Sequence, residues 1–249
     1  MSNYKFEKNT YYKDIKPNWE DRLEVEVGDI KKPDLFYPQI KVKRWDNEVN
    51  FSVRLKDDDY PNATVEYVGE KIKWTKGKRE AHLYDLPPKE DDPLLEDGGY
   101  EFEITLLEKP ATNVIEFSIE TKGVDCFYQP ELTPEQKAVI CVGGDEPGYI
   151  QPENVIGSYA IYYKDVPANY VGEKLYRVGK VCHIFRPKII DSAGTEVWGE
   201  LYIDENKKLL TVTIPQDFLN NAVYPVRHAA GFQMGFTGIG GATVTYLQL

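Results

Sequence analysis

Hydrophobic and polar positions alternate with a period of two along much of the second half of the chain. The alternation runs through residues 181–190 and resumes over 197–203 and 209–214, with turn-forming residues at 192–194 and 204–207 between the runs. Successive side chains of a strand point to opposite faces of a sheet, so this period is typical of half-buried strands. The pattern therefore predicts a β-meander.

The first half of the chain carries the same signal in short runs separated by turns. Asp46 and Asn47 lie between two of these runs and predict a hairpin turn. No repeat of solenoid or propeller length is visible. We predict an all-β fold, an antiparallel β-sandwich built as one large or two consecutive sandwich domains. The expected strands are 22–27, 36–42, 49–55, 64–68, 71–74, 81–84, 100–106, 114–121 and 155–163.

At most one or two short helices are expected. The segment 133–136 has the N-cap Thr133, the first-turn proline Pro134 and the early acid Glu135 of a helix start. The helix that they begin would end near Val142, because two glycines follow it.

The chain divides into four regions on composition. We predict an N-terminal arm with an edge strand over 1–33 and a first sandwich part over 34–130. A connecting loop with the short helix over 131–150 and a second sandwich part over 151–249 follow. The start of the arm mixes charges with aromatic residues and has few apolar ones, so we expect it to become ordered only against a partner.

The second sandwich part ends in a glycine-spaced tail. Phe232, Met234, Phe236 and Ile239 alternate there with small residues. Such a segment either forms the last strand of its own sheet or adds a strand to a neighbouring molecule.

Charge and cysteine usage narrow the possible partners. The net charge is −11, with a pI of about 4.9, which argues against binding to nucleic acid. Cys126, Cys141 and Cys182 are too widely spaced for a CxxC pair and odd in number for a disulfide scaffold. No apolar run has the length of a signal peptide or a membrane span, so we expect synthesis in a cytoplasm and no membrane insertion.

Two acidic runs and three histidines are the candidates for chemistry. The runs 57–59 and 90–92 lack the alternating ligands and the glycine of a calcium loop. His82, His183 and His228 belong to no nucleophile signature. We therefore predict no catalytic, cofactor-binding or metal-binding residues.

Cys182 and His183 are adjacent, yet neighbours in a strand project to opposite faces and cannot act as nucleophile and base.

The aromatic residues allow two interpretations. Exposed tryptophan and tyrosine rings could stack on sugar rings, whereas rings at alternating positions usually form a core. We predict core positions, with Trp198 as a buried packing residue, for Trp74, Tyr84, Phe102, Phe117 and Trp198.

Several blocks of the sequence resemble one family of large, β-rich, mostly uncharacterised proteins from metagenomic phages and candidate-phylum bacteria. The resemblance covers most of residues 36–240 and rests on 39–54, 101–123, 152–164 and 179–226. It implies a structural protein of a virion or cell surface. No catalytic residues are attached to that family.

These observations predict a non-enzymatic structural protein of a phage virion or surface assembly. Its expected partners are other copies of itself and other virion or surface proteins, with localisation in the virion after synthesis in a host cytoplasm. The alternatives are a carbohydrate-binding or adhesin module, and a hydrolase with a site carried by loops.

Overall fold

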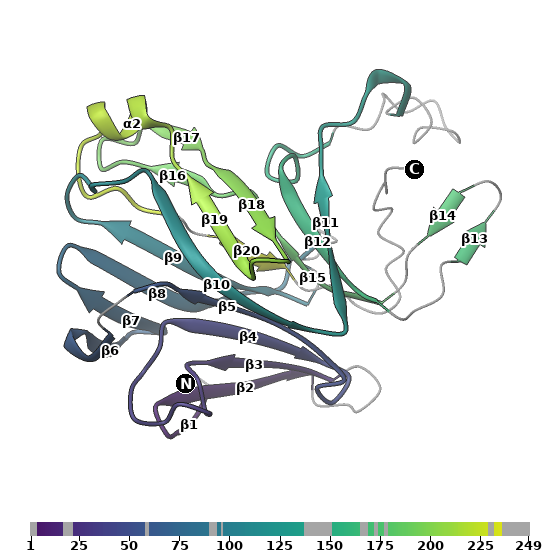
Figure 1. Ribbon diagram of the computed structural model, residues 1–249, viewed down its shortest axis with the longest axis horizontal. Helices are drawn as coiled ribbons and strands as arrows, with labels where there is room; N and C mark the ends of the chain where they lie inside the picture. Colours follow the sequence, from purple (N-terminus) through teal and green to yellow (C-terminus); the bar gives the residue numbers. More distant parts are fainter. Residues whose placement is uncertain are drawn as a thin grey trace.

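Two eight-stranded antiparallel sheets form a β-sandwich in a computed structural model of the chain (Figure 1). The predicted all-β class is confirmed, and the helices among the described residues are short. The structure describes residues 4–16, 22–57, 60–89, 94–95, 97–136, 151–164, 169–171, 174–176, 179–228 and 232–235.

Sheet I takes strands from both ends of the described chain. In spatial order its strands are β1 (Lys5–Glu7), β2 (Thr10–Lys16), β3 (Leu23–Val27), β4 (Gln39–Arg44), β5 (Val49–Leu55), β10 (Val114–Lys122), β19 (Leu209–Thr213) and β18 (Glu200–Asp204).

Sheet II also combines strands that are far apart in the sequence. In spatial order its strands are β11 (Val124–Gln129), β12 (Ser158–Tyr163), β15 (Lys180–Ile184), β20 (Phe232–Gly235), β9 (Gly99–Leu106), β8 (Arg79–Leu86), β7 (Lys71–Lys76) and β6 (Thr64–Val68).

The remaining elements are small. They are the hairpins β13 (Asn169–Val171) with β14 (Lys174–Tyr176) and β16 (Lys188–Ile190) with β17 (Glu196–Trp198), the 3-10 turn η2 (Tyr60–Asn62) and the helix α2 (Gln216–Asn221).

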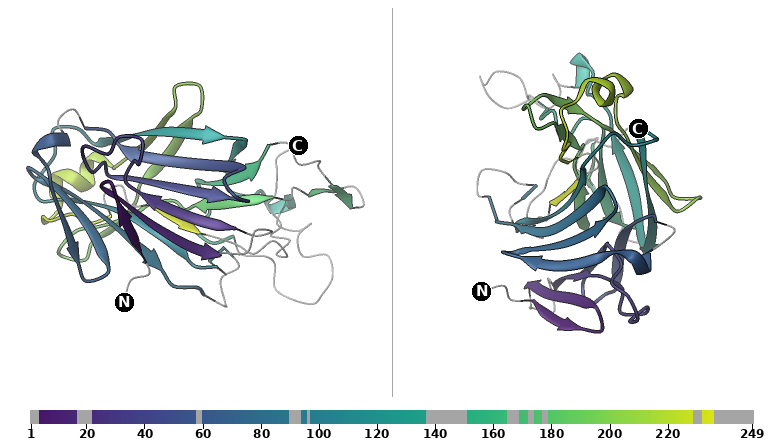
Figure 2. Two further views of the ribbon diagram at one scale, coloured as in Figure 1. Left: turned by 90° about the horizontal axis from the view of Figure 1, so that it is seen from below. Right: turned by 90° about the vertical axis from the view of Figure 1, so that its left-hand side faces the viewer.

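Both sheets contain strands from either side of the predicted connecting segment 131–150. Strand β19 pairs with β10 in sheet I, and β20 lies between β15 and β9 in sheet II. Figure 2 shows the purple N-terminal strands at one side of the sandwich and the green later strands at the other. The segment 131–150 therefore does not separate two independent sheets.

The core lies between the two sheets and follows the predicted alternation. Phe102 of β9 and Phe117 of β10 are fully buried and meet edge to face, with ring centroids 5.4 Å apart. Trp74 is also fully buried, as predicted. Burying an aromatic side chain of this size contributes about 1.5–3 kcal/mol. Pairs of this kind hold the inner faces of the sandwich together.

Chain turns follow the expected chemistry at two places. The β4–β5 hairpin turns through Trp45, Asp46 and Asn47, which all have positive φ. Residues 134–136 are helical, and Thr133 and Gln136 cap this turn reciprocally, each side chain accepting the other's backbone N–H at 3.2 and 2.9 Å. The predicted continuation to Val142 lies outside the described residues.

A single strand crosses from one sheet to the other. Gly123 joins β10 of sheet I to β11 of sheet II with φ of +65°, a conformation that favours glycine. A Cβ there would lie 3.0 Å from Val49 Cγ1, so the corner is also tightly packed.

The N-terminal segment differs from the predicted arm. β1 pairs with β2, and β2 pairs with β3 over the register Tyr11↔Val27 to Lys16↔Leu23. Residues 5–16 therefore belong to sheet I of their own chain. β3 pairs with β4 on one side, and the backbone on its other side pairs with this charge-rich hairpin.

The tail prediction is settled for the described residues 232–235. They form β20, a central strand, so the interpretation as a strand of the protein's own sheet is confirmed there. The rest of the tail, with Phe236 and Ile239, lies outside the described residues. Gly235 leaves room for the backbone of a covering loop, since a Cβ would lie 2.1 Å from the Leu94 carbonyl oxygen.

We expect Gly235→Ala to lower the free energy of unfolding by about 1–3 kcal/mol, the usual range for overpacking, because the loop backbone must move. Chemical denaturation monitored by tryptophan fluorescence measures this. Gly194→Ala is the control, because Gly194 has φ of +85° and a Cβ there would meet no atom within 4 Å. The strained backbone alone should lower the free energy of unfolding of this variant by about 1 kcal/mol. Equal losses in the two variants would show that the loop at Leu94 is not packed tightly against β20.

Candidate functional site

Strand β1 at the end of sheet I and strand β6 at the end of sheet II lie on the same side of the sandwich. We call this side the β1/β6 edge. All five residues of β6 are exposed, and among them Val65, Tyr67 and Val68 are large and hydrophobic. Phe6 of β1 is 60% exposed. An exposed apolar edge strand presents unpaired backbone groups to other chains.

Aromatic contacts hold this edge in place. Tyr11 of β2 stacks on Tyr67 of β6 with ring centroids 6.1 Å apart, and it also contacts Phe6 at 4.6 Å. Tyr4 donates a hydrogen bond to Asp85 at 2.6 Å, and burial raises the pKa of the Tyr4 hydroxyl. The β1–β2 hairpin is thus tied to sheet II as well as to β3.

The opposite side of the sandwich is the β11/β18 edge. Its strands are joined by the Cys126 N–H, which donates to Glu205 Oε1 at 3.3 Å, and by the Ile203 N–H, which donates to Tyr159 Oη at 3.1 Å. Tyr128 of β11 and Tyr202 of β18 are 52% and 58% exposed. Both sides of the sandwich therefore carry exposed rings on edge strands, although the Cys126 and Ile203 N–H groups of the β11/β18 edge are bonded to side chains.

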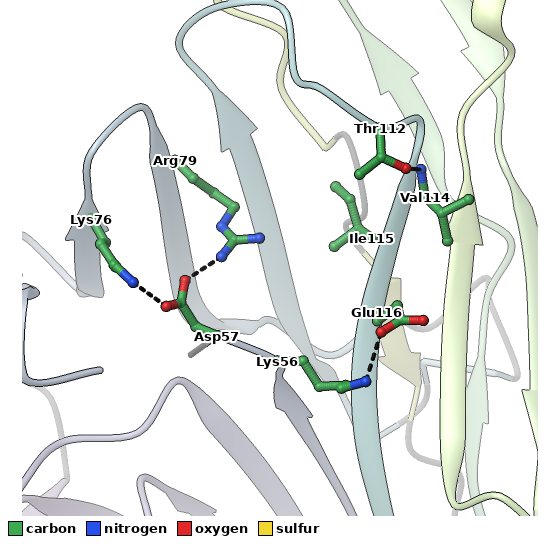
Figure 3. A pocket seen from close by; sticks show the side chains of 8 residues that line it. All are labelled: Lys56, Asp57, Lys76, Arg79, Thr112, Val114, Ile115 and Glu116. Carbon is green, nitrogen blue, oxygen red and sulfur yellow. Dashed lines mark hydrogen bonds and ion pairs between the residues drawn. The ribbon is translucent and has the colours of Figure 1, made fainter. Parts of the chain in front are cut away.

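A charged cavity of about 630 Å³ lies at one end of the sandwich, between β5, the β7–β8 hairpin and β10 (Figure 3). Asp57 forms ion pairs with both Lys76 and Arg79, and Lys56 Nζ lies 2.7 Å from Glu116 Oε2. These oppositely charged groups pair with one another across strands, so we assign them a structural role. The two cations on Asp57 also oppose the binding of calcium by this acidic run.

No group of three or more potential metal ligands occurs in the part of the chain that the structure describes. Of the predicted acidic runs, only Asp57 is described. Likewise, no described helix is long and apolar enough to span a membrane.

Trp198 lines a second cavity, of about 410 Å³. The prediction that Trp198 is a buried packing residue is wrong, because Ile189 and Val197 turn the other face of the β16–β17 hairpin to the core and leave the Trp198 ring only partly buried. Arg186 Cζ and Lys188 Nζ lie 5.5 and 5.8 Å from its centroid. Tyr84 is likewise only partly buried, on the outer face of sheet II.

Glu101, from the outer face of β9, contributes to the wall of this cavity and is 2% exposed. Its Oε1 lies 3.3 Å from His228 Nδ1, whereas its buried Oε2 has no hydrogen-bond partner among the described residues. A buried polar atom without a partner costs about 1–3 kcal/mol. Such an atom in a cavity wall is a candidate contact for a ligand.

Glu103, two residues along β9, is fully buried, but both of its carboxylate oxygens have hydrogen-bond donors. It accepts from Arg227 Nε and Tyr84 Oη, both at 3.1 Å, and Lys71 Nζ lies 3.7 Å away. Burial by itself would raise the pKa of Glu103, but the neighbouring His228, Arg227 and Lys71 outweigh it and hold the pKa below its usual value. Val226 pairs with Leu106 at the end of β9, and the side chains of Arg227 and His228 therefore lie against Glu103 and Glu101 on the outer face of the strand.

A serine–histidine pair lies under the outer surface of sheet II. Ser158 Oγ and His183 Nε2 are 2.7 Å apart, and both residues are buried. His183 Nδ1 has no partner among the described residues, so nothing described orients the ring as the acid of a triad does. Burial of both groups also keeps substrate away.

Cys182 points to the other face, as predicted, where burial raises its pKa to about 12. The pair that strand geometry brings together is thus Ser158 with His183, from two neighbouring strands, and not Cys182 with His183.

In comparisons with protein families, with curated proteins and with solved structures, no match to this chain was found. The resemblance to phage and surface proteins therefore stays a prediction.

Burial holds His183 neutral, and Lys180 adds to this effect, so its pKa is well below 6.5. Unfolding restores the ordinary pKa, and the unfolded chain then binds an extra proton below that pH. We expect the free energy of unfolding to fall between pH 6.5 and pH 5, by up to about 1.4 kcal/mol per pH unit from this residue.

Urea unfolding at a series of pH values measures this slope. His183→Gln should make it shallower, whereas Ser158→Ala removes the hydrogen-bond partner but should keep the slope. Equal slopes in the wild type and in His183→Gln would show that the ring is protonated in the folded protein.

Proposed function

We propose that this protein is a structural subunit of an assembled particle, in which neighbouring copies contact one another through the β1/β6 and β11/β18 edges. The observation that carries the proposal is the pair of open eight-stranded sheets with exposed aromatic and aliphatic side chains at both edges. A protein that stays monomeric usually protects such edges with charges, prolines or covering segments.

Strand lengths favour a second copy of this chain as the partner. β6 has five residues and β11 has six, so the free edge of β6 in one copy matches that of β11 in the next. Pairing of this kind uses the backbone groups along each strand edge, and at β11 the Cys126 N–H would exchange Glu205 for the partner strand. It extends sheet II from copy to copy. The exposed rings of both edges would then be buried between subunits.

Such a contact is heterologous, because the two surfaces that meet are different. Repeated heterologous contacts close into a ring or continue as an open lattice. Both outcomes suit a shell, a tail or a surface layer. The resemblance to virion and surface proteins favours a phage virion as the particle, with other virion proteins as further partners.

Two substitutions test the arrangement, one on each edge. Val68→Lys puts a charge on β6, and Tyr128→Lys puts one on β11, at side chains that are 55% and 52% exposed. We expect the wild type to form multimers that grow with concentration and each variant to be monomeric. An equimolar mixture of the variants should form a one-to-one dimer, since each supplies the edge that the other lacks.

Size-exclusion chromatography with light scattering distinguishes these states. Val223→Lys, at a side chain that is 53% exposed outside both edges, is the control and should behave as the wild type. A wild type that is monomeric at every concentration would refute assembly of the protein with itself. Dimers of Tyr128→Lys alone would refute the head-to-tail arrangement and indicate pairing of β6 with β6.

A further inference from the structure

Four segments that are distant in the sequence meet around the cavity at Trp198. Glu101 comes from β9, and His228 follows a stretch that pairs with β16 through Ile190 and Arg227, whose backbone groups bond at 2.8 and 3.0 Å. The β16–β17 hairpin supplies Trp198. The fourth segment is the turn at 153–157, tied down by the Arg186 N–H, which donates to the Asn154 carbonyl at 2.9 Å.

The cavity wall combines an aromatic platform with groups of both hydrogen-bonding kinds. Lys188 and Trp198 are register partners in the hairpin and so share one of its faces. Arg186 donates from Nε to the Gly199 carbonyl at 3.0 Å, while its terminal nitrogens donate to no described residue. Glu101 Oε2 is an acceptor without a described donor.

A ligand that satisfies this wall must have an apolar face for the ring, donors for the carboxylate and acceptors for the guanidinium. Hydroxyl groups act as both donors and acceptors. Lys188 is paired with Glu196 and Glu101 faces His228, so Arg186 and Glu153 remain as opposite charges and the wall has no strong preference for an ionic ligand. A volume of about 410 Å³ is at the small end of the range for small-molecule sites.

We infer that this cavity binds a neutral saccharide unit, with the ring stacked against Trp198 and hydroxyl groups bonded to Glu101 and Arg186. His228, whose side chain is 23% exposed, lies over Glu101. Because Glu101 is 2% exposed, a bonded hydroxyl group would have to displace the His228 ring from the carboxylate. The turn at 153–157 adjoins Tyr128 of the β11/β18 edge at Gly157, whereas no described residue of β1 or β6 lines the cavity.

Saturation-transfer NMR and calorimetric titration with the methyl glycosides of glucose, galactose, mannose and N-acetylglucosamine test the inference. At least one glycoside should bind saturably in the millimolar range or tighter. Trp198→Ala and Glu101→Gln should each weaken that binding at least tenfold. Tyr202→Ala, which removes an exposed ring outside the cavity, should leave it unchanged.

Thermal unfolding of each variant confirms that it is folded. If Trp198→Ala fails to fold, Asn154→Trp is a second variant. Asn154 is partly exposed, and a tryptophan there should fill the cavity and abolish binding. Val68→Lys should bind as the wild type does, which separates this site from the edge contacts. Absence of binding by all four glycosides, or binding that survives both Trp198→Ala and Asn154→Trp, would overturn the inference.

Discussion

Strand β10 is the element on which the rest of the sandwich depends. It pairs with β5 on one side and with β19 on the other, and beyond Gly123 the same chain continues as β11 in the second sheet. The register of early and late strands in sheet I is therefore set by one strand. Its continuation across the corner also places an edge of sheet II beside β18, so the β11/β18 edge is a direct product of this turn.

The fold class and most strands could be predicted because the alternation of side chains is a local property. The run at 49–55 and the hairpin at Asp46 and Asn47 needed no knowledge of distant residues. Strand order was not predictable in this way. Nothing local to β20 indicates that it pairs with β9, more than a hundred residues earlier, and the charge-rich β1–β2 hairpin pairs only because β3 offers an edge.

The candidate sites were less predictable than the fold, since they form where segments cross. Glu101 and Glu103 alternate with buried residues of β9, a pattern typical of exposed acids, but the side chains of His228 and Arg227 lie against them. Trp198 shows the opposite error, because it lies on the face of its hairpin that points away from the core, where its ring stays partly exposed. Alternation specifies which face of a strand a residue occupies, and only the tertiary fold specifies whether another segment covers that face.

The central position of β20 has a consequence for biosynthesis. Until residues 232–235 leave the ribosome, β9 and β15 lack the strand that joins them, and sheet II exists as two separate parts with four edges. Folding of this sheet is therefore completed only after residues 232–235 have been synthesised, as expected for a topology dominated by distant contacts. During translation, crowded nascent chains would present these temporary edges to one another, so chaperones that shield unpaired strands should raise the yield of native protein.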